Sequence, residues 1–222
     1  EAARDLSRAL EDARDDLQRA RQRMSKFLLR HGLVFDETTP TGRRRSNWTE
    51  ACWRWARSIE FDEADDAAAY ERYTDAVDRC GEAKRELERR VVEAASRPEW
   101  APTVDALCPV KGVDVATAFL LAAEAGDFSR FPSAPSFAAW CGLAPSERSS
   151  GGIARAGNSH VRRALVEASW HVPMSTRHPK KPRPGHGVAP AASRHAAKCN
   201  RRLQDRRDAM SQAGKRPCVA NW

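Results

Sequence analysis

A short serine-containing stretch set among arginines is the first feature that could do chemistry. Ser149 and Ser150 precede two glycines, and Arg148 and Arg155 lie on either side of them. Guanidinium groups suit a phosphoryl centre because they are permanently charged and donate hydrogen bonds in a forked arrangement. A serine hydroxyl beside them could attack phosphorus if a base or a metal ion activates it. No activating group stands nearby in the sequence, so a solvated loop is the alternative interpretation.

A glycine turn is the second candidate. The pattern predicts a helix at Val104–Cys108, a turn through Lys111 and Gly112, and an apolar helix at Val115–Ala125 with Asp114 as its N-cap. In such a helix-hairpin-helix-like unit, backbone N–H groups and a helix N-terminus can hold a phosphate without contacting bases. The alternative is that Gly112 only joins two packed helices.

A third candidate is the predicted helix from Ser159 to His171, which we expect Asn158 to cap. Its apolar face contrasts with a polar edge that carries Arg162 and Arg163. The candidate nucleic-acid-binding residues are Lys111, Gly112, Arg148, Arg155, Asn158, His160, Arg162 and Arg163. No metal site is predicted, because His195 and Cys199 at a four-residue spacing are only half of one.

The charge distribution supports contact with a polyanion. The chain has 222 residues and a net charge of +8, yet residues 146–222 alone hold 16 basic and 4 acidic residues. Such a concentration of positive charge is typical of nucleic-acid binding. The alternative is a basic tail that only aids solubility.

Several classes of protein are excluded. No apolar run is long enough to span a bilayer, and no signal-like segment opens the chain. The six cysteines lie at least 19 residues apart without a CxxC pair, so neither a zinc knuckle nor a dense disulfide framework is expected. We therefore expect a cytoplasmic protein with reduced thiols and no membrane contact.

Two runs of apolar and small residues predict the elements that come before these candidates. Both keep the alternating three- and four-residue spacing of a heptad seam, which favours an antiparallel coiled-coil hairpin that closes within one chain or across a dimer. The runs are Leu6, Leu10, Ala13, Leu17, Ala20, Met24, Phe27 and Tyr70, Tyr73, Val77, Cys80, Lys84, Leu87, Val91, Ala94. Because the seam is short and polar, we expect the helices to pair with those of another copy of the chain, forming a homo-oligomer.

The remaining pattern predicts an all-α protein in three parts. These are a coiled-coil and linker region at 1–98, a small helical domain at 99–172 and a basic, partly disordered tail at 173–222. Within them we expect a short helix opened by Asn47 with Glu50 as its capping pair, and another from Ser136 to Trp140. Residues 173–193 are predicted to be disordered. A last basic helix is expected at 194–212.

Three strings of the sequence resemble one known family. They run from Phe128 to Ala134, from Gly142 to Gly151 and from Gly157 to His171. Together they are similar to the C-terminal transposase domain of the IS-one-ten family of bacterial insertion sequences, the bridge-RNA-guided recombinases. Residues 14–32 also look like the start of the family's coiled coil, and Lys111 and its neighbours look like its phosphate-facing hairpin.

The resemblance implies DNA transposition through a serine nucleophile. In that family a serine of the Ser-Gly motif forms a transient phosphoserine link to DNA, and a structured guide RNA directs strand exchange. The matching residue here is Ser150, with Ser149 as the alternative. The implied partners are DNA, a structured guide RNA and further copies of the chain, in the bacterial cytoplasm close to the nucleoid.

Two departures from the family's pattern qualify this expectation. The acidic, Mg²⁺-binding N-terminal half has no counterpart, because Glu1 already lies at the approach to the coiled coil. The stretch from Gly151 to Gly157 is short for the family, and Arg155 stands where a lysine is usual. We therefore expect the chain to bind no cofactor itself, to need Mg²⁺ only with the missing domain, and to be inactive alone. The alternatives are a non-catalytic nucleic-acid-binding or regulatory remnant of a transposase and a purely structural coiled-coil protein.

Overall fold

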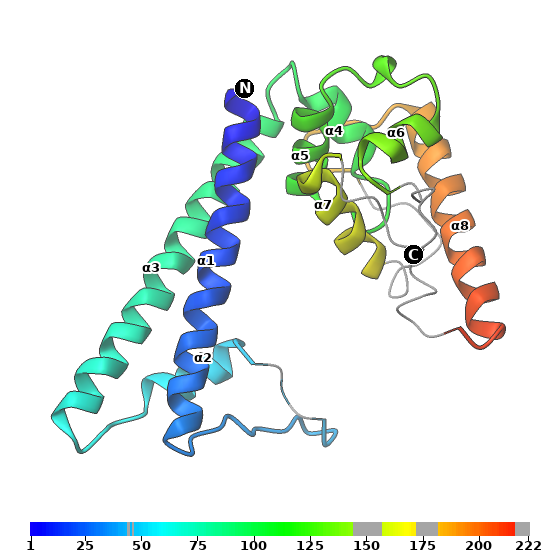
Figure 1. The fold of residues 1–222 in the computed structure, drawn as a ribbon. Coiled ribbons are helices and arrows are strands. Elements are labelled where there is room, and N and C mark those ends of the chain that lie inside the picture. Colours follow the sequence, from blue (N-terminus) through cyan, green and yellow to red (C-terminus); the bar gives the residue numbers. More distant parts are fainter. Residues whose placement is uncertain (44, 46, 144–156, 172–181, 216–222) are drawn as a thin grey trace. The chain divides into compact units, whose positions relative to one another are not determined.

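The computed structural model is all-helical, as the sequence predicts. It describes residues 1–43, 45, 47–143, 157–171 and 182–215, and these residues form helices, turns and loops without a strand. None of the helices formed by these residues is long and apolar enough to cross a membrane. The helices are α1 (Ala2–Arg30), α2 (Glu50–Arg57), α3 (Ala64–Ala95), α4 (Ala101–Leu107), α5 (Val115–Ala125), the short 3-10 helix η1 (Phe128–Arg130), α6 (Ala134–Trp140), α7 (Ser159–Trp170) and α8 (Pro190–Gln212) (Figure 1).

The chain divides into two compact units. The first unit comprises Glu1–Leu10 and Glu88–Trp222, and the second unit comprises Glu11–Leu87. This division follows spatial contacts, whereas the predicted boundaries at residues 98 and 172 follow changes in sequence pattern. Those sequence-based boundaries stay a prediction.

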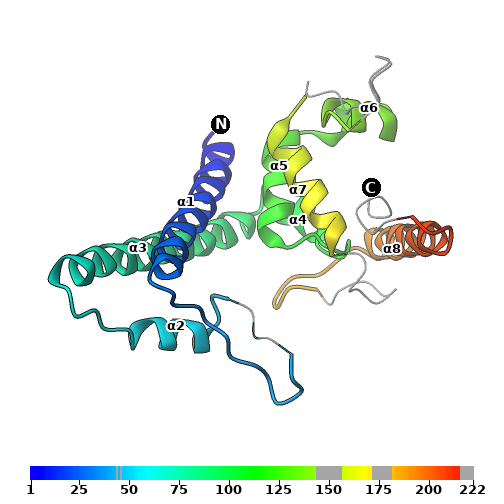
Figure 2. The ribbon, with the colours of Figure 1, turned by 60° about the horizontal axis from the view of Figure 1, so that its bottom comes forward.

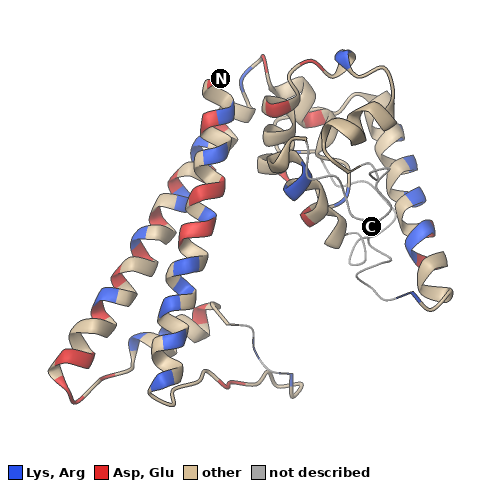
Figure 3. Ribbon diagram, in the orientation of Figure 1, with Lys and Arg blue, Asp and Glu red and all other residues tan. Residues whose placement is uncertain are grey.

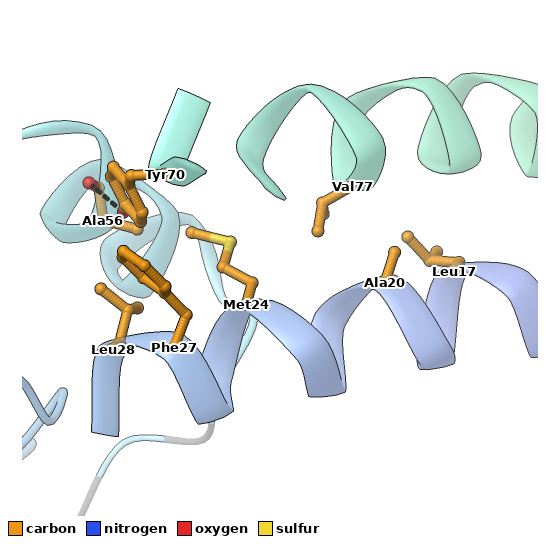
Figure 4. Packing of buried hydrophobic residues seen from close by; sticks show 8 residues of the cluster. All are labelled: Leu17, Ala20, Met24, Phe27, Leu28, Ala56, Tyr70 and Val77. Carbon is orange, nitrogen blue, oxygen red and sulfur yellow. Dashed lines mark hydrogen bonds between the residues drawn. The ribbon is translucent and has the colours of Figure 1, made fainter. Parts of the chain in front are cut away.

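In the second unit, α1 and α3 pack through the apolar faces that the heptad pattern predicts. The predicted seam residues are buried or half-buried, and Met24 is fully buried. Leu17, Ala20 and Val77 meet in one cluster between the two helices (Figure 4). Apolar burial at this spacing is what holds a narrow helix seam together. Whether α1 and α3 form a coiled coil with another copy stays a prediction.

An aromatic group closes one end of the second unit. Phe27 lies with its ring centroid 5.9 Å from that of Tyr70 and 5.4 Å from that of Phe61. The buried Tyr70 hydroxyl donates a 2.7 Å hydrogen bond to the carbonyl oxygen of Ala56 in α2 (Figure 4). Burial raises the pKa of Tyr70 to about 12, so it stays a neutral donor. This contact fixes α2 against α3.

The predicted start of α2 is wrong by two residues. Thr49, not Asn47, is the N-cap, and its hydroxyl accepts a hydrogen bond from the backbone N–H of Cys52. The chain turns sharply before this cap, because Trp48 adopts the left-handed region with φ of +65°. For a bulky residue that conformation is strained.

In the first unit, α5 is the central helix. Its sequence is almost wholly apolar, and it is buried from Ala118 to Ala125. The predicted cap is confirmed, since the Asp114 carboxylate accepts from the N–H of Thr117 at 2.7 Å. Leu120 and Leu121 pack with the fully buried Cys141 and Val161, which brings α5 and α7 side by side (Figure 2).

The prediction of disorder across residues 173–193 is wrong for residues 182–193. Arg183 and His186 both contact the carboxylate of Asp105 in α4. From Pro190 the chain is already helical, so α8 starts four residues earlier than expected. The composition suggested disorder because it is rich in Pro, Gly and basic residues, but one buried acceptor holds the segment.

Candidate nucleic-acid interface

The predicted nucleophiles lie on a stretch whose two ends are joined. Residues 144–156, which include Ser149, Ser150, Arg148 and Arg155, lie outside the described residues. On either side of them, the backbone N–H of Asn158 donates a 2.9 Å hydrogen bond to the carbonyl oxygen of Trp140. The chain therefore leaves α6 and returns to α7 at nearly one place.

Gly157 makes this close return possible. Its φ is +108°, and a Cβ there would lie only 2.6 Å from the Trp140 carbonyl oxygen and 2.7 Å from the Gly142 nitrogen. Only glycine combines this conformation with so near an approach of two backbones. This close return explains why glycine precedes Asn158 in the family-like string.

Asn158 caps α7 and also ties it to α5. The prediction of its capping role is confirmed, because its Oδ1 accepts from the N–H of Val161 at 3.0 Å. Its Nδ2 donates to Glu124 Oε2 at 2.7 Å. Arg8 of α1 donates to both oxygens of the same carboxylate, at 2.9 and 3.3 Å. A buried acid therefore links three helices at the base of the serine stretch.

The Glu124 carboxylate is charged in this environment. Only 3% of the residue is exposed, and burial alone would raise its pKa. Hydrogen bonds from Arg8 and Asn158, with the positive charge of Arg8, outweigh burial and hold the pKa below its ordinary value. His160 adds a smaller favourable charge. No role was predicted for Glu124 from the sequence, although a lone acid in an apolar helix is a signal of a buried partner.

The predicted basic residues of α7 lie at different depths. Arg163 is exposed on the helix, whereas Arg162 and His160 are half-buried. One terminal nitrogen of Arg162, NH1, is buried and has no hydrogen-bond partner among the described residues. These three residues lie in the first turns of α7, where the positive end of the helix dipole also favours an anion. Their contact with nucleic acid stays a prediction.

The glycine turn packs against α7. Gly112 has φ of +83°, and a Cβ there would lie 2.1 Å from the carbonyl oxygen of Ala168. The backbone N–H of Lys111 donates to Asn200 Oδ1 of α8 at 2.9 Å, and Asn200 Nδ2 donates to the Pro109 carbonyl oxygen at 3.1 Å. The observed geometry is thus that of a tight turn between packed helices, which is the alternative interpretation of this sequence. A phosphate contact of Lys111 and Gly112 stays a prediction.

Asp105 is another buried acid that the sequence did not single out. Its Oδ1 accepts from Arg183 at 2.7 Å, and its Oδ2 lies 3.1 Å from His186 Nδ1. All three side chains are at most 23% exposed. Arg183 and His186 lie 78 and 81 positions from Asp105 in the sequence, so no local pattern can predict these contacts.

Side chains that could bind a divalent metal ion do not cluster in the described residues. Across the described parts of the chain, no three His, Cys, Asp or Glu side chains gather in a way that could hold one.

Comparison with known proteins relates these residues to one family. Residues 104–182 match the family described as "Transposase IS116/IS110/IS902 family", and the matched range covers the glycine turn, α5, the serine stretch and α7. No solved structure matches the chain.

Two curated relatives extend the likeness beyond that range. The chain is 34% identical over 176 residues to a protein of Sinorhizobium fredii (strain NBRC 101917 / NGR234) named "Putative transposase y4qE", covering 77% of this chain and 40% of the relative. It is 30% identical over 128 residues to the "Transposase for insertion sequence element IS1533" of Leptospira borgpetersenii, covering 58% of this chain and 35% of that protein. The chain thus spans well under half the length of either relative. Residues 104–182 accordingly match a transposase domain of the IS116/IS110/IS902 family.

Proposed function

We propose that this chain acts in DNA transposition as the C-terminal part of a serine-using transposase. The observation that carries the proposal is the family match across residues 104–182, which contains Ser150. The joined ends of the serine stretch at Trp140 and Asn158 support it, because they give a reacting side chain a fixed base.

The proposed step is attack by serine on a DNA phosphodiester. The Ser150 hydroxyl oxygen forms a bond to phosphorus, the bond from phosphorus to one deoxyribose oxygen breaks, and that oxygen takes up a proton as the serine loses one. Arg162 and Arg163, with Arg148 and Arg155, supply positive charge for the phosphoryl oxygens. Lys111 and Gly112, Asn158 and His160 complete the proposed nucleic-acid contacts.

The proposed partners are DNA, a structured guide RNA and further copies of the chain. Self-association is supported by the second unit, where Leu29 and Val34 are 63% and 51% exposed. Both residues line one hollow of the second unit, and a contiguous apolar surface is the kind that another chain can cover. We further propose that the chain is inactive alone and needs acidic, Mg²⁺-binding residues from another segment or chain.

A covalent-adduct assay tests the proposal. The chain is mixed with labelled donor DNA, guide RNA and Mg²⁺, with and without a relative's N-terminal half, and protein–DNA adducts are resolved on a denaturing gel. We expect adducts only when the acidic half is present, and their loss in Ser150→Ala but not in Ser149→Ala.

Two outcomes would contradict parts of this proposal. Adducts formed by the chain alone would overturn the inactivity claim, and adducts retained in Ser150→Ala but lost in Ser149→Ala would move the attack to the neighbouring serine. Absence of adducts in every mixture, with nucleic-acid binding intact, would favour the non-catalytic remnant. Such binding should weaken with salt, with a log–log slope of about −5 for six phosphate contacts.

A further inference from the structure

A groove in the second unit is lined by cationic side chains and lies outside the site described above. Its volume is about 590 Å³, and α1 provides most of its wall. The charged residues that line it are Arg14, Arg21, Lys26 and Lys84, and none of the described lining residues carries a carboxylate. The remaining lining residues include Gln18, Gln22 and Ser25, which also donate hydrogen bonds.

The groove follows a change in the charge of α1. Acidic residues occur up to Asp16, whereas Leu17–Arg30 contains five basic residues and no acidic one. Figure 3 shows this succession of Lys and Arg along the lower part of α1. The net charge of the whole chain does not reveal this basic stretch, because acidic residues elsewhere offset its positive charge.

One cation of the groove is held in place by an aromatic ring. The Arg21 guanidinium lies 5.1 Å from the centre of the Trp48 ring, a cation–π contact. Its Nε is buried and donates to no acceptor among the described residues. A stacked guanidinium loses less conformational entropy when it binds an anion than a mobile one does.

Trp48 itself is held in a strained backbone conformation. Its φ of +65° is rare for a bulky residue and strains the backbone. Trp53 lies beside it, with ring centroids 6.0 Å apart. Strain of this kind persists where surrounding contacts require it, and here it brings an indole ring against a cation in a groove.

The spacing of the cations indicates the shape of the ligand. Arg14 and Lys26 are twelve positions apart on one helix, which corresponds to about 18 Å along the axis. A single small anion could contact one or two of these side chains. A strand that carries a negative charge at every nucleotide matches a line of cations, and an aromatic ring among cations is typical of strand-binding grooves.

We propose that this groove binds the phosphodiester backbone of a nucleic-acid strand, as a second surface separate from the predicted contacts of the first unit. The proposal does not require strand cleavage. It therefore stands or falls independently of the role of Ser150.

Binding by charge-matched double variants tests the proposal. Fluorescence anisotropy of the full chain is measured at about 0.1 M salt with labelled single-stranded RNA, single-stranded DNA and duplex DNA, each of about 20 nucleotides. The test variant is Arg21→Gln with Lys26→Gln. The control is Arg19→Gln with Arg23→Gln, which removes the same charge from exposed positions of the same helix outside the groove.

The test variant should bind at least tenfold more weakly, and the control less than threefold. Each lost phosphate contact on a single strand is worth roughly fivefold at this salt concentration and lowers the salt slope by about 0.7. The probe that shows the larger difference identifies the strand as RNA or DNA. Equal weakening by both double variants would overturn the proposal, since charge alone would then explain binding.

A gain-of-binding variant covers the case in which the test variant fails to fold. Gln18→Lys adds a cation to the exposed rim of the groove and should tighten binding severalfold. No tightening by Gln18→Lys would contradict the proposal. So would competition by poly-glutamate at the same charge concentration as strongly as by the nucleic acid, because the groove would then recognise acidic protein.

Discussion

The two units of the molecule fix their helices by different means. In the second unit, aliphatic and aromatic side chains of α1, α2 and α3 interlock around Phe27 and Tyr70. In the first unit, Glu124, Asp105 and Asn200 are buried polar residues, and each binds a partner more than thirty positions away in sequence. Both units are helical, but in the described residues of the first unit the buried polar side chains are among the contacts that join its helices.

This difference affects how precisely each unit positions its helices. An apolar seam tolerates small shifts of one helix along another, because the hydrophobic effect has no direction. A buried carboxylate needs its partners at hydrogen-bond distance, so Glu124 specifies where α7 begins. The serine stretch leaves from that point, and a polar framework therefore sets its base.

The largest effect should come from the apolar seam. Phe27→Ala removes a buried ring that contacts Phe61, Tyr70 and Tyr73, and should lower the free energy of unfolding by about 3–5 kcal/mol. Urea unfolding followed by circular dichroism measures it. Leu29→Ala on the same helix, 63% exposed, is the control and should change little. Similar losses in both variants would show that the seam is not the source of stability.

The next effect concerns the glycine turn of the first unit. Gly112→Ala places a methyl group against the backbone of Ala168 and should cost about 3 kcal/mol in thermal unfolding. Gly126→Ala has a similar positive φ but open space around it, and should cost only the backbone strain, about 1–2 kcal/mol. Equal losses would mean that φ alone, rather than the approach to α7, makes glycine necessary.

Glu124→Gln tests the polar framework. The change removes the charge that Arg8 and Asn158 bind while keeping the size of the side chain, and should lower stability by about 2 kcal/mol. The exposed Glu167→Gln on α7 serves as the control. A destabilisation no larger than that of the control would place Glu124 outside the interactions that hold the first unit together.

The smallest effect is a pH dependence of that same contact. Because the pKa of Glu124 is held below its ordinary value of 4.5, its contribution is fully present above that value and is lost as pH falls through the folded pKa. The stability difference between the unaltered chain and Glu124→Gln should therefore be constant above about pH 5 and shrink as the pH falls below the ordinary carboxyl pKa. A difference that stayed constant as the pH fell would show that Glu124 is not charged in the folded chain.

The features that the sequence predicted correctly, in both units, are those whose signals are local. The heptad spacing identified the buried faces of α1 and α3, and the caps Asp114 and Asn158 were read from single positions. The cap of α2 was misplaced because a left-handed Trp48 delays the helix to Thr49.

The framework of the candidate site could not be predicted in this way. Arg8 and Glu124 are 116 positions apart, and nothing in their own neighbourhoods pairs them. Contacts with Asp105 hold residues 182–193, whose composition suggested disorder, and composition alone cannot reveal such contacts. The nucleophile predictions at Ser149 and Ser150 stay untested because these residues lie outside the described parts of the chain.

The backbone clasp between Trp140 and Asn158 also bears on protein engineering. Because it secures both ends of the intervening peptide, extra amino acids inserted there would add chiefly loop-closure entropy, about 0.6 kcal/mol for each doubling of length. Reporter tags could thus be inserted after residue 143 while the clasp and the buried Cys141 stay in place.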